Sequence, residues 1–246
     1  MNFESFKQKV IDIFAANPSL PMPSAEQVEK LFALTEIMLE VNKSMNLTAI
    51  TEESAVILKH YADSVSISSL IPEGARMIDV GCGAGFPTLP LAIFRPDVKI
   101  LGLDGTAKRI EYVKSTASKL GLSNVDAIAG RAEDYANKPE YRETFDIATA
   151  RAVASLPVLC EICIPFVKIG GSFVAMKAAQ GSAELRESAR AITLCGGSLA
   201  RQLDVSLTSP DPSSAPESRL IIEISKVSAT PKTYPRHYSQ ISKRPL

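Results

Sequence analysis

The chain has 246 residues, of which 46% are hydrophobic, and its 27 basic and 27 acidic residues give a formal net charge of zero. This length suffices for one α/β domain with an appendage, or for two small domains. A net charge of zero means that the protein as a whole does not attract a polyanion electrostatically. No apolar run approaches the ~20 residues of a membrane span. The N-terminus carries no signal-peptide pattern, so we expect a cytoplasmic protein without a membrane partner.

Residues 1–71 are expected to form a helical N-terminal extension. Phenylalanine, valine and isoleucine recur at helical spacing from Phe3 to Phe14, and Ser24 followed by Gln27 matches a helix-capping box. The stretch 57–71 also has a helical pattern. The extension is too small to bury much apolar surface alone, so we expect it to pack against the next domain.

Residues 72–228 alternate between strand-like and helical segments, which predicts a parallel sheet covered on both faces. Helical patterns are expected at about 85–93, 106–120, 155–166 and 182–194. Strands are expected at 76–81, 98–104, 125–130, 145–151, 171–177, 198–208 and 219–227. The last two are separated by a short polar, proline-rich segment, which predicts that a mostly parallel seven-stranded sheet ends in an antiparallel pair.

The last stretch, residues 229–246, is expected to be a basic C-terminal tail. Residues 226–246 contain five basic residues and no acid, whereas residues 1–75 contain five lysines and ten acids. Such a tail predicts an electrostatic contact with nucleic acid, with a solvated terminus as the alternative.

The cysteines do not predict a metal site. Cys160 and Cys163 form a C-x-x-C pair, but a structural zinc site normally needs a second pair, and none is present. The apolar residues around the two cysteines favour packing on one helix face. We therefore expect no metal and four reduced thiols.

A glycine-rich turn follows the first expected strand and precedes a helix. Gly81, Gly83 and Gly85 allow a tight turn and a close approach to a ligand, but Phe86 stands where a dinucleotide-binding fingerprint has its third glycine. Asp104 ends the next strand, where a carboxylate can bind both ribose hydroxyls of an adenosine ligand, with a helix N-cap as the alternative.

Other acidic residues are expected beside the same turn. Asp79 precedes the glycines, and Ala132 and Glu133 follow the third strand at the expected adenine position. No basic cluster compensates these carboxylates at the turn. The pocket therefore favours a sulfonium-bearing ligand, S-adenosylmethionine, over a pyrophosphate such as that of NAD.

The chain resembles the bacterial 16S ribosomal RNA guanine-N7 methyltransferases, the glucose-inhibited division protein B family. The resemblance implies an α/β fold of the class I S-adenosylmethionine-dependent methyltransferases, which is Rossmann-like, with a helical N-terminal extension. It spans nearly the whole chain and rests on "NKSMNLTAI" (42–50), "KHYADS" (59–64), "DVGCGAGFPTLPLAI" (79–93), "AKRIEYV" (107–113), "GRAED" (130–134), "TARAVASL" (149–156), "GGSFVAMK" (170–177) and the proline-basic end.

Position by position, the resemblance implies cofactor contacts from Gly81, Phe86, Ala132, Glu133 and Arg151. The sequence departs from the family where Cys82 replaces a small polar residue and where Thr88 and Ala178 replace glycines. Ala178 puts in question the shape of the loop beside the target base.

The implied reaction is methyl transfer to guanine N7, which has an in-plane lone pair and no proton, so no general base is required. We name Arg151 and Lys177, at the ends of two strands, as candidates to position the substrate; for Arg151 a surface salt bridge is the alternative. His60 is expected to anchor the extension, with substrate contact as the alternative, and His237 to have no catalytic role.

N7 lies in the deep major groove of an A-form helix, so we expect the target guanine in a loop or unpaired strand, or extruded. Lys108, Arg109 and Lys114 are candidates for phosphate contacts, or for a solvated helix face. The predicted partner is 16S RNA in the 30S subunit, not DNA, and the protein is expected to be a monomer. The alternatives are a methyltransferase of another acceptor and a noncatalytic ribosome-binding module.

Overall fold

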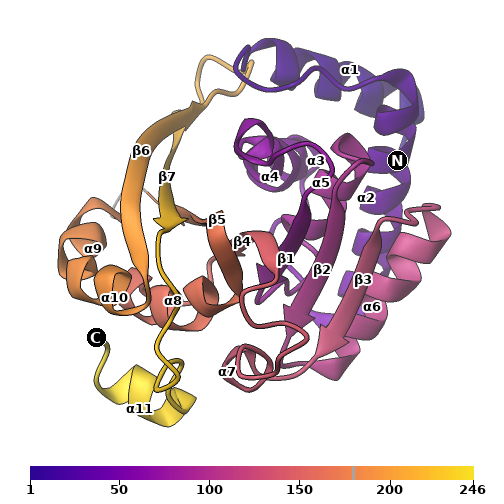
Figure 1. The fold of residues 1–246 in the computed structure, drawn as a ribbon. Coiled ribbons are helices and arrows are strands. Elements are labelled where there is room, and N and C mark those ends of the chain that lie inside the picture. The colour runs from indigo at the N-terminus through magenta and orange to yellow at the C-terminus, as the bar shows by residue number, and fades with distance from the viewer. Residues whose placement is uncertain (179–180) are drawn as a thin grey trace.

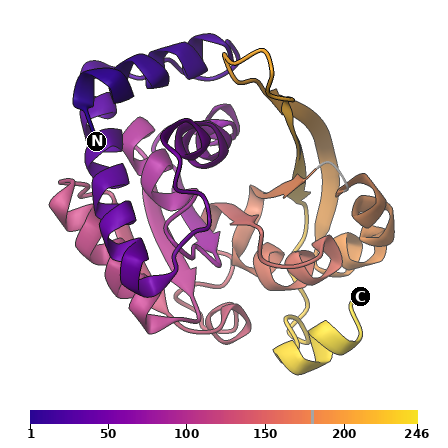
Figure 2. The same cartoon turned by 180° about the vertical axis from the view of Figure 1, so that it is seen from behind.

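The computed structural model describes residues 1–178 and 181–246. Two long helices begin the chain, α1 (Phe3–Ala15) and α2 (Ala25–Met45). The capping box predicted from the sequence is present, because the Ser24 hydroxyl accepts from the Gln27 amide and the Gln27 side chain accepts from the Ser24 amide. Both helices wrap around one side of the molecule (Figures 1 and 2).

A nearly continuous helical stretch follows and includes one π-helical turn. It consists of α3 (Glu53–Val56), the π-helical segment η1 (Ile57–Ala62), α4 (Asp63–Val65) and a short 3₁₀ turn, η2 (Ser68–Leu70). Single π-turns inside helices occur frequently at functional sites. This one carries Lys59 and His60, and Asp63 follows directly.

The sheet has seven strands in the order β3-β2-β1-β4-β5-β7-β6. The first five strands are parallel, and β7 is antiparallel to both of its neighbours, as the sequence predicts. The strand order reverses between β1 and β4, and open α/β sheets bind ligands at the carboxyl ends of strands beside such a reversal. The strands are β1 (Arg76–Val80), β2 (Lys99–Asp104), β3 (Val125–Ala129), β4 (Phe145–Arg151), β5 (Val167–Ala178), β6 (Gly197–Leu207) and β7 (Glu217–Lys226).

The remaining helices are α5 (Thr88–Phe94), α6 (Ala107–Lys119), α7 (Ala132–Tyr135), α8 (Leu156–Cys163), η3 (Ile164–Phe166), α9 (Gly181–Glu187), α10 (Ala189–Leu194) and α11 (Tyr238–Lys243). The single helix predicted over 182–194 is wrong, because α9 and α10 are separate. The break falls at Ser188, whose amide is shared between the carbonyls of Glu184 and Leu185, at 3.0 and 3.2 Å, and whose hydroxyl also donates to the Glu184 carbonyl at 2.6 Å.

Two apolar clusters lie on opposite faces of the sheet. The N-terminal helices, α5 and α6 share the first cluster with alternate strand residues such as Met77 and Ile147. The second contains α8, including Cys160 and Cys163, and packs on the intervening strand residues such as Ile78 and Ala148. The N-terminal extension therefore shares its core with the sheet.

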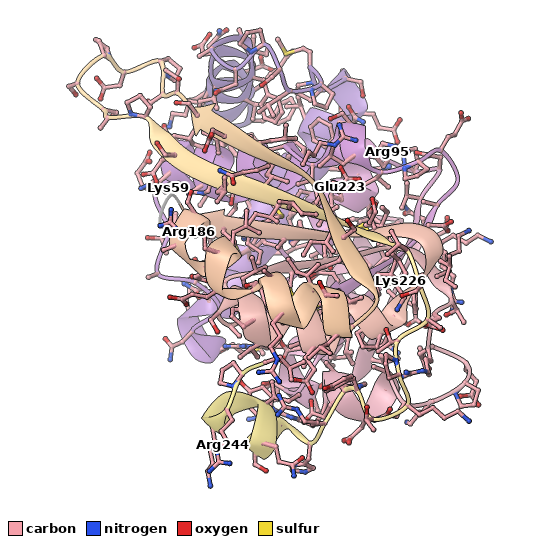
Figure 3. All side chains as sticks on the ribbon, turned by 60° about the vertical axis from the view of Figure 1, so that its left-hand side comes forward. Lys59, Arg95, Arg186, Glu223, Lys226 and Arg244 are labelled. Atoms are coloured by element: carbon pink, nitrogen blue, oxygen red, sulfur yellow. The ribbon has the colours of Figure 1, made fainter. Side chains whose placement is uncertain are left out.

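After β7 the C-terminal segment runs to α11. This helix lies on the same side of the sheet as α7 (Figure 1). Lys226 is buried and pairs with Glu143 at 2.9 Å, and Arg236 pairs with Glu161 at 2.6 Å. The segment is therefore docked at these two residues and is not wholly solvated. Lys232, Lys243 and Arg244 are exposed, and Figure 3 shows Arg244 projecting from α11.

Candidate active site

The glycine-rich turn is fixed to the neighbouring strand. The amides of Gly81 and Cys82 both donate to the Leu103 carbonyl, at 2.7 and 3.1 Å. Gly81 has a φ of +79°, and a Cβ at this residue would lie 2.4 Å from Val153 Cγ2. Glycine is therefore required here by backbone conformation and by space.

Asp104 lies at the edge of this turn, with 9% of its surface exposed. Its Oδ2 accepts from the Gly83 amide at 3.0 Å and its Oδ1 from the Thr106 amide at 2.8 Å. The side chain thus fixes both the turn and the entry to α6. The N-cap residue of α6 is Thr106, so the alternative that Asp104 is the N-cap is wrong.

Asp79 lies fully buried beneath the turn. Its Oδ2 accepts from the Thr88 hydroxyl at 2.6 Å, and its Oδ1 is buried without a protein partner. Burial raises the pKa of Asp79 to about 6, although the Thr88 hydroxyl and the charge of Arg151 act in the opposite direction. Thr88, one of the departures from the family pattern, therefore holds a functional carboxylate candidate in place.

A cavity of about 100 Å³ opens beside the turn and brings together four of the predicted cofactor residues: Gly81, Asp104, Ala132 and Glu133. Arg131, Val153 and Tyr238 also line it. Sequence reasoning missed these three, and only Arg131, next to Ala132, had a local signal. Val153 covers Gly81, and the Arg131 guanidinium lies over the Tyr238 ring at 4.2 Å.

A second cavity, of about 470 Å³, lies next to the first. Consecutive residues line the two cavities: Arg151 and Ala152 line the larger one, and Val153 lines the smaller one. The larger cavity is lined by Lys59, His60 and Asp63 from the N-terminal extension, by Arg151 and Lys177 from the sheet, and by Arg219. Its volume is within the ~300–1,000 Å³ range usual for ligand sites.

Arg151 lies on the side of the larger cavity and does not line the smaller one. Its Nη1 donates to Asp63 Oδ2 at 2.7 Å and to the Lys59 carbonyl at 3.1 Å. Asp63 also pairs with Arg219 through Oδ1 at 3.1 Å. The alternative of a surface salt bridge is wrong, since the side chains of Arg151 and Asp63 are 15% and 5% exposed.

His60 is stacked on Phe86, with ring centroids 4.4 Å apart. Its Nε2 lies 2.9 Å from the Thr48 hydroxyl, and its Nδ1 lies 3.5 Å from Arg151 Nη2. Because Arg151 can only donate, Nδ1 is the acceptor and Nε2 carries the proton. Burial, together with the charge of Arg151, lowers the pKa of His60 to about 4. His60 therefore both anchors the extension and lines the larger cavity.

Phe86 does not lie where the family resemblance implies a cofactor contact. Its ring is 5% exposed and packs between His60 and Tyr61 in the first apolar cluster. It does not line the smaller cavity. The aromatic residue after the glycines thus connects the turn to the N-terminal extension.

Lys177 contacts the segment that follows β4 and the helix α9. Its Nζ donates to the Ala154 carbonyl at 2.8 Å and pairs with Glu184 Oε2 at 2.9 Å. The same oxygen of Glu184 accepts from the Leu156 amide at 2.6 Å. Lys177 therefore fixes the segment that separates the two cavities.

The other candidates lie outside the two cavities. Lys114 pairs with Asp126 at 3.3 Å, and Arg109 Nη1 is 3.9 Å from Asp104. Lys108 is exposed, and His237 caps α11 by accepting from Ser239. Within residues 1–178 and 181–246, no group of three or more His, Cys, Asp or Glu could hold a metal ion. Over the same residues, no helix has the length and apolar character needed to cross a membrane.

The sheet order and the site at its carboxyl edge define the fold class. It is the α/β fold of the class I S-adenosylmethionine-dependent methyltransferases. A Methanosarcina mazei protein of the group called SAM-dependent methyltransferases aligns with a TM-score of 0.51 at 15% identity, covering 65% of this chain and 96% of that one. M. jannaschii TYW2, solved in complex with AdoMet, aligns with a TM-score of 0.51 at 15% identity, covering 68% and 75%.

Sequence comparison gives the family. The chain belongs to the family described as rRNA small subunit methyltransferase G, whose sequence model matches residues 27–207. Ribosomal RNA small subunit methyltransferase G from Alkaliphilus metalliredigens is 45% identical over 89% of this chain and 91% of that protein. The protein of the same name from Lactobacillus helveticus is 40% identical over the full length of both chains. The family membership expected from the motifs is confirmed.

Proposed function

We propose that this chain transfers a methyl group from S-adenosylmethionine to N7 of a guanine in 16S ribosomal RNA of the small subunit. The observation that carries the proposal is the pair of adjacent cavities, separated by Arg151–Val153, in a chain whose relatives are named for rRNA methylation. The lining residues of the smaller cavity suit the adenosine part of the methyl donor, and the larger cavity suits the base.

The residues beside the glycine turn fit the cofactor. Asp104 offers a carboxylate for the ribose hydroxyls, and Ala132 and Glu133 stand at the adenine end of the smaller cavity. The unpartnered Oδ1 of Asp79 is a buried acceptor suited to an ammonium group. Gly81 and Gly83 provide backbone without side chains. When bound, the cofactor supplies an electrophilic methyl group on a sulfonium.

The larger cavity fits a nucleophile that has no proton to lose. Among the described residues, the carboxylates lining it are Asp63 and Glu184, and both are held in ion pairs. His60 is neutral at pH 7, and both of its nitrogens have partners. Guanine N7 needs no general base, so this chain's contribution is to orient the base and to exclude water. Arg151, Arg219 and Lys59 also line the cavity and are held in ion pairs, so they can donate to a base edge or a phosphate through the N–H groups that these pairs leave free.

The partner in this proposal is 16S RNA in the 30S subunit, met in the cytoplasm by a monomer. Figure 3 shows Lys59 and Arg186 on the side of the molecule that carries β6 and β7. Lys59 is already paired with Glu217 at 2.7 Å. Since the net charge is zero, we expect recognition to depend on the shape of the ribosomal RNA more than on overall attraction.

The test uses 30S subunits from a strain that lacks this methylation. The purified chain is incubated with the subunits and with tritiated S-adenosylmethionine, and labelled guanines are mapped in the extracted RNA. We expect about one label per subunit, at N7 of one guanine. Label elsewhere would favour a methyltransferase of another acceptor. Absence of both label and calorimetric cofactor binding at high micromolar concentration would favour a noncatalytic ribosome-binding module.

A further inference from the structure

The C-terminal helix α11 contributes one wall of the smaller cavity. Tyr238, its first residue, lines this cavity together with Asp104, Ala132 and Glu133. Tyr238 lies outside residues 27–207, which the family model matches. This wall of the cavity therefore lies beyond the segment that the family model matches.

The position of Tyr238 is fixed by anchors on both sides. Before it, Arg236 donates to Glu161 Oε1 from its amide at 2.9 Å and from Nε at 2.8 Å, and to Oε2 from Nη2 at 2.6 Å. Glu161 is fully buried in α8. After it, Ile241 is fully buried in the second apolar cluster. The tyrosine ring is thus held by the fold and does not depend on a mobile terminus.

The tail is also connected to the helix that carries Glu133. The side-chain nitrogen Nδ2 of Asn137 donates to the Glu133 carbonyl at 2.9 Å and to the Pro235 carbonyl at 3.4 Å. Arg142 donates to the carbonyls of Ala136 and Tyr234, at 3.1 and 3.0 Å. The adenine end of the cavity and the tail are therefore one connected structure.

Tyr238 and Arg131 form a stacked pair at the cavity wall. The Arg131 guanidinium carbon lies 4.2 Å from the centroid of the Tyr238 ring, and Arg131 Nε lies 3.3 Å from Glu133 Oε1. Aromatic and guanidinium planes are the groups on which proteins stack nucleobases, and each base–aromatic stack typically contributes ~1–3 kcal/mol. Tyr238 is half-buried, packs against the second apolar cluster and lines the cavity as well.

We propose that Tyr238 is a binding residue for the adenosine half of S-adenosylmethionine, with Arg131 as its stacking partner and the Arg236–Glu161 pair as its anchor. This inference rests on the cofactor given under the proposed function. It makes Tyr238 of the C-terminal tail part of the cofactor site, and it assigns to the tail a role distinct from RNA binding.

Calorimetry tests the contact. The wild type, Tyr238→Leu, Tyr238→Phe and the control Lys243→Ala are titrated with S-adenosylmethionine and with S-adenosylhomocysteine, which share the adenosine. Leucine keeps apolar volume and loses the aromatic face, so we expect the Kd of Tyr238→Leu to rise at least about fivefold, by the same factor for both ligands. Phenylalanine and the exposed Lys243→Ala should stay within about twofold of wild type.

A spectroscopic readout is independent of turnover. The chain contains no tryptophan, so Tyr238→Trp introduces a single tryptophan at the cavity wall, whose emission can be excited selectively over that of the tyrosines. Its emission should change with S-adenosylmethionine concentration and saturate at the calorimetric Kd.

The outcomes separate this inference from the proposed function. A wild type that does not bind S-adenosylmethionine would overturn both. A wild type that binds, with Tyr238→Leu binding equally well and Tyr238→Trp emission unchanged, would overturn the role of Tyr238 alone. The melting temperature of Tyr238→Leu, compared with that of Lys243→Ala, shows whether the tail has stayed docked.

Discussion

The imidazole of His60 lies flat against the ring of Phe86, with an interplanar angle of 6°. This contact joins the π-helical turn of the N-terminal extension to the residue that follows the glycine turn. Asp79 lies buried directly before the same turn. Two buried titratable groups, a base and an acid, therefore lie on either side of the glycine turn, and their pKa values are shifted in opposite directions.

The pH dependence of stability should differ in sign for these two groups. The folded-state pKa of His60 is lowered from 6.5 to about 4, so its contribution is complete above pH 6.5 and is lost as the pH falls through about 4. The folded-state pKa of Asp79 is raised from 3.8 to about 6, so its contribution is complete below pH 3.8 and is lost as the pH rises through about 6. Each shift corresponds to roughly 3 kcal/mol.

Single variants should reveal these opposing contributions. Relative to wild type, Asp79→Asn should gain about 3 kcal/mol in the free energy of unfolding between pH 4 and pH 7.5. His60→Gln should lose about the same amount over this range. Urea denaturation at several pH values measures both. If the free energy of unfolding changes with pH in the same way in variant and wild type, the assigned pKa shifts are contradicted.

Asp104→Ala should weaken the cofactor and loosen the turn. The change removes the acceptor for the amides of Gly83 and Thr106, which should cost about 1–3 kcal/mol of stability. Calorimetry should show a Kd for S-adenosylmethionine raised at least about tenfold, because the ribose loses a charged acceptor. Asp126→Ala, at an exposed position of the adjacent strand, is the control. If the Kd does not change, Asp104 does not bind the ribose.

Arg151→Ala should separate base positioning from cofactor binding. Arg151 lines the larger cavity and fixes Asp63, so its loss should lower the rate of rRNA methylation by at least about tenfold. The Kd for S-adenosylmethionine should change less than about threefold, because other residues line the smaller cavity. Arg151→Lys keeps the charge without the forked geometry and should recover only part of the rate. A raised Kd with an unchanged rate would instead support the cofactor contact implied by the family resemblance.

The local features of this fold could be predicted from the sequence. Strand-like segments that alternate with helical ones located the strands, the spacing of Ser24 and Gln27 located the start of α2, and the glycines located the turn between β1 and α5. Each of these signals depends on neighbouring residues or on the fixed geometry of a strand-turn-helix unit. Tertiary packing does not change them.

The pairings across the molecule could not be predicted in this way. Asp63 and Arg219 are 156 residues apart and Glu161 and Arg236 are 75 apart, yet each pair forms an ion pair. The family resemblance implied a cofactor contact from Phe86, but its ring packs against His60 and does not line the smaller cavity. Tyr238 had no local signal, since its role depends on where the tail docks.

The ion pair between Arg236 and Glu161 should control the docking of this tail. Glu161 is fully buried, so Arg236→Ala leaves a buried carboxylate without its cation, and we expect a loss of about 3–5 kcal/mol in the free energy of unfolding. Replacing both residues by leucine removes the buried charge as well and should recover most of this loss. Lys232→Ala, at an exposed position on the same tail, is the control. Urea denaturation of the four proteins measures the effect. A loss below about 1 kcal/mol in Arg236→Ala would show that the pair contributes no more than an exposed salt bridge, and that other contacts hold the tail.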